Sequence, residues 1–183
     1  MLSLLTFPDP RLKNKASKVD PCDPENKIII EQLRAEIQQY RAYGMNAPMF
    51  GIAKSIVVLN PQASSPEENK SIPEVLLNPE IIAASGEMQK IEEGSPCFYG
   101  ISAEVSRPAK ITVRYQDVEG NSYEFDVEGF KATVIQHQMD HLMGKNFLDH
   151  LSPLKRNLLL KKMSQIAKHG DNHHVHGPNC HHD

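Results

Sequence analysis

Two histidines four residues apart constrain this chain more than any other feature of its sequence. His137 and His141 lie in a segment, 129–143, in which apolar residues recur with helical spacing. On a helix, side chains four residues apart project from the same face, one turn above the other. Two imidazoles in this arrangement can bind one divalent metal ion. The sequence therefore predicts a helix that carries part of a metal site and is packed among the other elements.

The residue after the first histidine is Gln138. In metallohydrolases of the H-E-x-x-H kind this position is a glutamate that acts as general base. A glutamine has nearly the same shape, but its neutral amide accepts no proton at a useful pH. The alternative is a pair of ordinary core or surface histidines without metal. The neighbouring Asp140 favours the metal site, because a ligating imidazole needs an acceptor for its second N–H.

Composition indicates one globular domain. The 183 residues are enough to bury a core, and the formal net charge of −3 with scattered Lys and Arg argues against a nucleic-acid partner. No apolar run approaches the roughly 18 residues that span a bilayer, and the first residues lack the basic region of a signal peptide. Cys22, Cys97 and Cys180 are odd in number and far apart, so no disulfide framework is implied. We expect a cytoplasmic protein that binds neither nucleic acid nor membrane.

Hydrophobic periodicity predicts an α+β fold, with mostly antiparallel strands around the central helix that carries the histidines. A turn is expected at Asn78-Pro79, and the turn-forming residues 117–121 are expected to close a hairpin. Helices are expected at 27–42, 129–143 and 152–168, and strands at 55–59, 75–77, 81–82, 109–115 and 123–127.

The chain divides into a domain at 1–168 and a histidine-rich tail at 169–183. The tail has no hydrophobic period, and we expect it to be disordered. Two interpretations stay open for it: a solvated tail without a role, or a segment that captures metal, since imidazole and thiolate clusters bind zinc, nickel or copper. Its potential ligands are His169, His173, His174, His176, Cys180, His181 and His182.

Five stretches, in order along about 155 residues, resemble the peptide deformylase family. Residues 136–142 read Q-H-Q-M-D-H-L and are similar to Q-H-E-x-D-H-L, and residues 42–49 fall where the family has G-x-G-L-A-A-x-Q. Residues 77–80 and 86–94 resemble the approach to the family's E-G-C-L-S motif. The remaining similar segments are 8–12 and 151–155.

This resemblance implies a deformylase-like fold and a metalloamidase that removes the formyl group from the N-terminal methionine of new polypeptides. It implies one divalent metal ion, such as Fe²⁺, Zn²⁺ or Ni²⁺, on His137, His141 and a cysteine. It also implies formylated peptide N-termini as partners. An association with the ribosome is a further expectation, above all for a paralogue without turnover. Among the catalytic positions, Gln138 takes the place of the general base and Met49 that of the glutamine that stabilises the oxyanion. Gly44 belongs to the same glycine motif and is counted with them.

The third metal ligand and the second oxyanion donor are altered as well. In a gapless alignment Ser95 takes the place of the ligating cysteine, and Pro96, which has no N–H, replaces the leucine whose backbone donates to the oxyanion. If the loop is shifted by two residues, Cys97 reaches the metal and the Phe98 N–H becomes the donor. Both alignments stay open. Asn46 is a further departure, since the family motif has alanine there.

These substitutions lead us to expect weak or lost deformylation. Two alternatives remain: an inactive paralogue that binds peptide N-termini, and a metal-handling protein that acts through its histidine-rich tail.

Metal stoichiometry with and without residues 169–183 tests the tail. The metal-handling interpretation predicts that deleting these residues lowers the number of Zn²⁺ or Ni²⁺ ions bound per chain by at least one, as measured by elemental analysis after dialysis. Unchanged stoichiometry would exclude the tail as a metal store.

Overall fold

The computed structural model describes residues 2–61, 63 and 74–170, and the side chains of these residues up to 168. It contains three α-helices, three short 3₁₀ helices and seven strands in the described ranges. The helices are α1 (Pro24–Gln39), α2 (Gly129–Leu142), α3 (Pro153–Gly170), η1 (Pro10–Lys13), η2 (Ala47–Phe50) and η3 (Phe147–His150). The strands are β1 (Gly44–Asn46), β2 (Ile56–Leu59), β3 (Glu74–Ala84), β4 (Met88–Gly94), β5 (Ser102–Pro108), β6 (Lys110–Gln116) and β7 (Ser122–Glu128).

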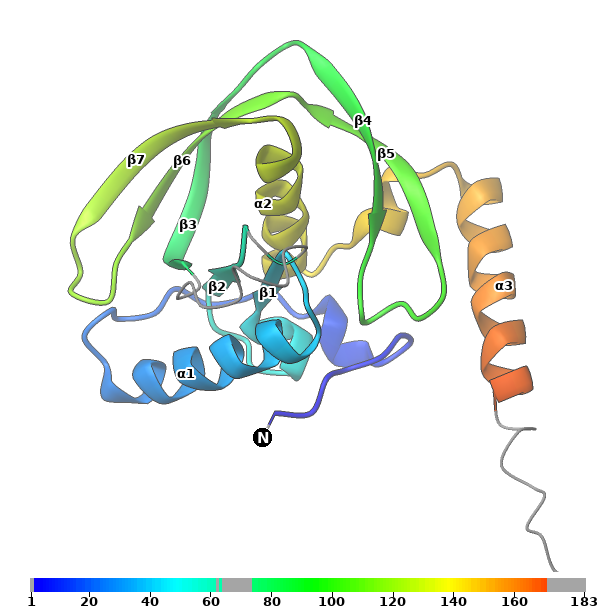
Figure 1. Cartoon of the computed structure of the whole chain (residues 1–183), viewed down its shortest axis with the longest axis horizontal. Helices are drawn as coiled ribbons and strands as arrows, with labels where there is room; N and C mark the ends of the chain where they lie inside the picture. Colours follow the sequence, from blue (N-terminus) through cyan, green and yellow to red (C-terminus); the bar gives the residue numbers. More distant parts are fainter. Residues whose placement is uncertain (1, 62, 64–73, 171–183) are drawn as a thin grey trace, which may run out of the picture.

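The strands form two antiparallel sheets that surround α2. The larger sheet has the order β1-β2-β3-β6-β7, and β4 pairs with β5 in a separate ribbon. Figure 1 shows α2 in the middle, with the larger sheet on one side and the β4–β5 ribbon on the other, while α1 lies across the open end. The expected α+β fold, with antiparallel strands around the central helix that carries both histidines, is confirmed.

The β6–β7 hairpin matches its prediction closely. Its strands pair from Lys110↔Glu128 to Gln116↔Ser122, and the turn between them contains Gly120 at a φ of 87°. Asp117 closes the turn by accepting the backbone N–H groups of Glu119 and Asn121. A short acidic side chain and a glycine with positive φ are the usual chemistry of such a turn. The hairpin leads directly into α2, which begins at Gly129.

The expected turn at Asn78-Pro79 is wrong. The two short strands predicted around it are parts of one strand, β3, and the register with β6 shifts between Leu77 and Glu80. Asn78 adopts a φ of 50°, and its side chain bonds to both the N–H and the C=O of Val19. The residues that signalled a turn therefore form an irregularity that bends the strand without ending it.

Strands β4 and β5 were not predicted from the sequence. Their residues are mostly polar, and every second residue of β5 is exposed. Such segments lack the aliphatic and β-branched content that usually identifies a strand. The pairing from Met88↔Pro108 to Gly94↔Ser102 nevertheless holds Glu93 and the following Ser95 beside α2.

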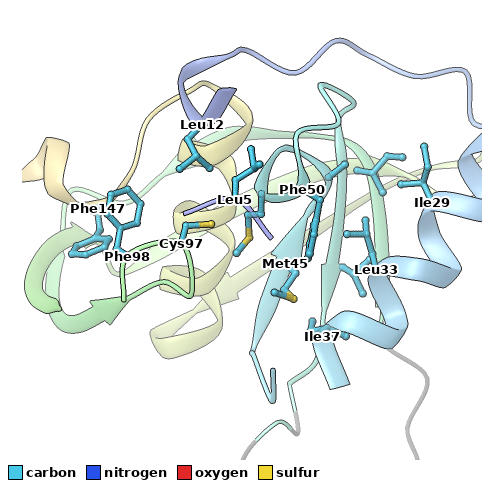
Figure 2. Packing of buried hydrophobic residues seen from close by; sticks show 14 of the residues in the cluster. Leu5, Leu12, Ile29, Leu33, Ile37, Met45, Phe50, Cys97, Phe98 and Phe147 are labelled. Atoms are coloured by element: carbon cyan, nitrogen blue, oxygen red, sulfur yellow. The ribbon is translucent and has the colours of Figure 1, made fainter. Parts of the chain in front are cut away.

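Two hydrophobic clusters form the core, one on each face of the larger sheet. Strand β2 separates them, because Ile56 and Val58 belong to the first cluster and Val57 and Leu59 to the second. A strand buried on both faces reads as a continuous apolar run, as this one does. Figure 2 shows the first cluster, with the apolar side of α1 at one end and Phe98 at the other.

The helix ends follow local chemistry. Asp23 caps α1 by accepting the N–H of Glu25, and Pro24 takes the first helical position, so the helix starts three residues before its predicted beginning. Helix α3 runs to Gly170, two residues past the predicted end, along the outer side of the β4–β5 ribbon (Figure 1).

The tail lies outside the described residues from 171 onward. None of the helices in the described ranges is long and apolar enough to cross a membrane.

Truncating Leu33 tests the packing of α1. Its side chain is fully buried in the first cluster, so Leu33→Ala removes buried methyl groups and leaves a cavity. We expect the free energy of unfolding to fall by about 2–5 kcal/mol in a urea titration. The matched change Ile28→Ala, on the exposed side of the same helix, should alter it by no more than about 0.5 kcal/mol. Equal effects of both variants would contradict this packing.

Candidate active site

A cavity of about 370 Å³ lies beside α2 and contains most of the predicted site positions. Its walls come from the end of α1 and the chain into β1, from η2, from the end of β4 and from α2. The predicted residues on its wall are Gly44, Met49, Ser95, His137 and Gln138. Residues that are 94 positions apart, Gly44 and Gln138, thus meet in one cavity.

His137 is held by a chain of buried charged groups. Its Nδ1 lies 2.8 Å from Glu93 Oε2, and Glu93 also binds Arg107 through both carboxylate oxygens, at 2.5 and 2.9 Å. Arg107 in turn lies 2.8 Å from Asp140, which accepts His150 Nε2 at 2.7 Å. The contact with Glu93 leaves Nε2 as the free nitrogen of the His137 ring. The network therefore fixes the orientation of the first histidine.

The network also fixes the charge of Glu93. Burial by itself would raise the pKa of this carboxyl, but the hydrogen bonds with Arg107 and His137 outweigh it and lower the pKa to about 2. Glu93 is therefore ionised at neutral pH and fully engaged with its partners. It cannot serve as a proton acceptor in the cavity, although it lies on the cavity wall.

His141 is buried with an unused ring nitrogen. Its Nε2 is one of two buried side-chain atoms without a hydrogen-bond partner among the described residues. Burial, together with the nearby His137 and Arg107, lowers the pKa of His141 to about 3, so the ring is neutral. The two imidazole rings have their centroids 5.1 Å apart. A neutral imidazole with an unpaired buried nitrogen is the form of histidine that binds a metal.

A thiolate ligand does not accompany these histidines. Cys97 belongs to the first hydrophobic cluster with no exposed surface, and it does not line the cavity (Figure 2). Burial raises the pKa of its thiol to about 12, so it carries no charge there. Ser95 lies on the cavity wall in its place. This arrangement corresponds to the gapless alignment of the two that the sequence left open.

The donor set therefore fits the implied metal only in part. The histidine pair provides two suitable nitrogens, but the third position offers a neutral hydroxyl, which is a poor ligand for iron or zinc. In the described part of the chain, no group of three His, Cys, Asp or Glu side chains is arranged to hold a metal ion. The residues present do not reproduce the two-histidine, one-cysteine set that the resemblance implies.

The two positions to which the resemblance assigns oxyanion donors carry no donor group. Met49 lines the cavity and packs in the first cluster, and its thioether has no proton to donate. Pro96 lines the cavity without an N–H. The substitute that the shifted alignment suggested is engaged elsewhere, because the Phe98 N–H donates to the Ser95 carbonyl at 2.8 Å.

Gln138 is held by a hydrogen bond from Asn46, a contact that the sequence did not predict. Asn46 Nδ2 donates to Gln138 Oε1 at 2.7 Å, and both side chains are buried. Gly44 makes room for this arrangement, since a Cβ atom there would lie 2.8 Å from Gln138 Nε2. The departure of Asn46 from the family motif is visible in the sequence, but its contact with Gln138 is not.

Two further residues of this network, Glu93 and Arg107, received no role from the sequence. Glu93 lies in the similar segment 86–94, whereas Arg107 lies outside the similar segments. The signal that identifies them is an acidic and a basic residue buried together, with 4% of each side chain exposed. Charged groups are seldom buried unless they are paired, so such a pair marks a structural or functional centre. Only the fold reveals this burial.

Stability against pH tests the two buried titrating groups in metal-free protein. His141 has a folded pKa of about 3 against 6.5, and Glu93 about 2 against 4.5. Both pKa values are depressed, so the unfolded chain binds more protons and stability falls as the pH is lowered. We expect a slope of up to about 1.4 kcal/mol per pH unit between pH 6.5 and 4.5 from His141, with Glu93 adding to it below pH 4.5.

The variants His141→Gln and Glu93→Gln separate these contributions in urea titrations at several pH values. The first should flatten the curve between pH 6.5 and 4.5. The second should lower stability at pH 7 by about 3–5 kcal/mol, because it leaves Arg107 without its main buried partner. A wild-type curve that is flat from pH 7 to 4.5 would contradict the assignment for His141, and one that is flat below pH 4.5 would contradict that for Glu93.

Comparisons with known proteins identify the family to which this fold belongs. The family model described as polypeptide deformylase matches residues 1–157. A protein of Rickettsia conorii named peptide deformylase-like is 43% identical over 177 residues, covering 96% of this chain and 93% of that protein. Peptide deformylase 2 of Xanthomonas campestris is 39% identical, covering 92% of this chain and 98% of its own length.

Solved structures show the same fold. The crystal structure of a peptide deformylase from Legionella pneumophila has a TM-score of 0.84 and 30% identity, with 93% of this chain and 98% of that chain covered. The structure of a peptide deformylase from Synechococcus elongatus in complex with actinonin has a TM-score of 0.83 and 31% identity, covering 89% and 88%. The chain belongs to the peptide deformylase family.

Proposed function

We propose that this protein binds the formylated N-termini of peptides and hydrolyses the formyl group slowly or not at all. Membership of the family implies formyl-methionine deformylation by a metal-dependent enzyme. The residues of this chain form a cavity but do not supply the general base, the thiolate ligand and the oxyanion donors that the family implies. The observation that carries the proposal is the neutral, hydrogen-bonded amide of Gln138 at the position where deformylation needs a proton acceptor.

The cavity suits the end of a peptide. Its volume lies in the usual range of sites for small ligands, and its wall is largely apolar. Tyr43 and Phe130 pack edge to face on this wall, with ring centroids 4.7 Å apart. Such a wall can accommodate a flexible, polarisable methionine side chain. Binding of the methionine side chain therefore does not require the groups that carry out deformylation.

Proton transfer is the step that this site cannot perform in the usual way. Removal of a positioned general base costs roughly 100- to 10,000-fold in rate. Glu93 is no replacement, because its carboxylate is ionised with a lowered pKa and bound to Arg107 and His137. The other carboxylate on the described cavity wall, Glu92, is exposed and accepts the hydroxyl of Ser102, so it does not replace a buried general base.

Stabilisation of the oxyanion is weakened as well. Met49 and Pro96 occupy the positions of the two donors, and neither carries an N–H or O–H. Loss of one such donor costs roughly 100- to 1,000-fold in rate. Residues that act together do not contribute additively, so the combined loss is smaller than the product. Even so, each alteration lowers the expected rate of deformylation.

Hydrolysis of a formyl-methionine tripeptide tests the proposal. We expect protein incubated with ferrous iron or nickel, with the tail removed to avoid metal capture, to turn over at least about 100-fold more slowly than a typical enzyme rate of about 10 s⁻¹. The same tripeptide should bind, as measured by isothermal titration calorimetry. Turnover near 10 s⁻¹ in this protein, with the residues of the cavity unchanged, would contradict the proposal.

Stepwise restoration gives the matching control. Gln138→Glu alone should recover little activity, because the donors and the third ligand are still missing. Combining it with Met49→Gln, Ser95→Cys and Pro96→Leu should recover much more, by at least about 100-fold over the single variant. Gln165→Glu makes the same chemical change on the exposed side of α3 and should have no effect.

A further inference from the structure

Asn46 has an orientation that the backbone determines. Its side-chain oxygen caps η2 by accepting the N–H of Met49 at 3.1 Å. A backbone N–H can only donate, so the atom of Asn46 that faces it must be the oxygen. The Asn46 nitrogen, Nδ2, is therefore the atom that faces away from η2. The usual ambiguity between the oxygen and nitrogen of an amide is absent here.

The orientation of Asn46 in turn determines the orientation of the Gln138 amide. Asn46 Nδ2 has protons and no acceptor capacity, so the atom of Gln138 that lies 2.7 Å from it must be the oxygen. Gln138 Nε2 is left on the other side, against Gly44, and both residues line the cavity. Among the hydrogen bonds of the described residues, none uses Nε2 of Gln138 as the donor. The position of the missing base thus carries a fixed and unused hydrogen-bond donor.

We propose that the Asn46–Gln138 pair makes this cavity selective for formylated over unformylated N-termini, with Gln138 Nε2 donating to the formyl oxygen. The proposal rests on the proposed binding of peptide N-termini and adds the group that is recognised. Asn46 is then a positioning residue, because it acts only by holding the amide of Gln138 in one orientation.

The two kinds of N-terminus differ in whether they accept or donate a hydrogen bond. A formylated N-terminus offers a carbonyl oxygen, which accepts a hydrogen bond. A free N-terminus is mostly a protonated amine at pH 7 and offers only N–H donors and a positive charge. Opposite Gln138 Nε2, donor would face donor, and buried donors without partners weaken binding. A glutamate at position 138 would instead attract the protonated amine.

The other carboxylates of the cavity do not reverse this preference. Glu93 already has Arg107 and His137 as close partners. Glu92 is exposed and accepts the hydroxyl of Ser102 at 2.6 Å, so its charge is screened by solvent. The described part of the cavity wall therefore has no carboxylate free of these partners to receive a protonated amine next to Gln138.

Peptide binding by the full-length protein tests the proposal. The probes are Met-Ala-Ser peptides with a C-terminal fluorophore and a formylated, acetylated or free N-terminus, and mass spectrometry confirms that each stays intact during the measurement. We expect the formylated peptide to bind at least about 10-fold more tightly than the free amine, by fluorescence anisotropy. The acetylated peptide shows how much of this depends on the small size of the formyl group.

Two variants distinguish recognition by hydrogen bonding from selection by the shape of the cavity. Gln138→Glu should reduce the preference for the formylated peptide by at least about 10-fold, because a carboxylate favours the amine. Asn46→Asp keeps the cap on η2 but places an oxygen where Nδ2 was, so the amide of Gln138 must turn its oxygen toward the cavity. We expect the preference to fall by about 5-fold or more. Gln165→Glu, with the same charge change on α3, should leave it unchanged.

The side-chain NH₂ signals of Gln138 give a readout that does not depend on the folding of the Asn46→Asp variant. These signals are assigned in a ¹⁵N–¹H spectrum as the pair that disappears in Gln138→Glu. They should shift when the formylated peptide is added and shift much less with the free amine.

The outcomes separate the two proposals. If the formylated peptide binds but the preference survives both variants, or if the Gln138 signals do not move, recognition by Gln138 is overturned while peptide binding stands. If none of the peptides binds, the proposed function fails and the selectivity with it.

Discussion

The buried ion pair between Glu93 and Arg107 holds together the parts of the molecule that form the site. It joins β4 to β5, and it reaches α2 through His137 and Asp140. Because both charges are almost fully buried, removal of either partner would leave the other without its main partner in a poorly solvated place. The β4–β5 ribbon, which contributes little to the hydrophobic core through β4, is thereby fixed against the helix that carries the histidines.

The altered positions of the cavity form a consistent set. Gly44 leaves the space that the side chain at position 138 occupies, and Asn46 supplies a donor for the Gln138 oxygen. Met49 replaces a polar side chain by one that extends the apolar cluster. Asn46 is paired with Gln138 and Met49 is packed in the first cluster, as a stable interior requires. The altered positions therefore fit the fold around the cavity, in keeping with the proposed binding of peptide N-termini.

The main elements of the fold could be predicted because their signals are local. The period of α1, the turn chemistry of the β6–β7 hairpin and the apolar run of β2 each depend on residues within one segment. The failures have the opposite cause. Asn78 bends a strand because its side chain binds Val19, 59 positions away, and β4 is a strand mainly because β5 lies beside it. Pairing between distant segments overrides weak local preference.

The sequence by itself determined that the histidines share one helix face and that position 138 has no proton acceptor, since spacing and side-chain chemistry are local properties. It also supplied both candidates for the third ligand, Ser95 and Cys97. Only the tertiary structure showed where each residue lies: Ser95 is on the cavity wall and Cys97 is in the hydrophobic core. It alone brought Asn46 to Gln138 across 92 positions of the chain, so the direction of that amide is a property of the fold.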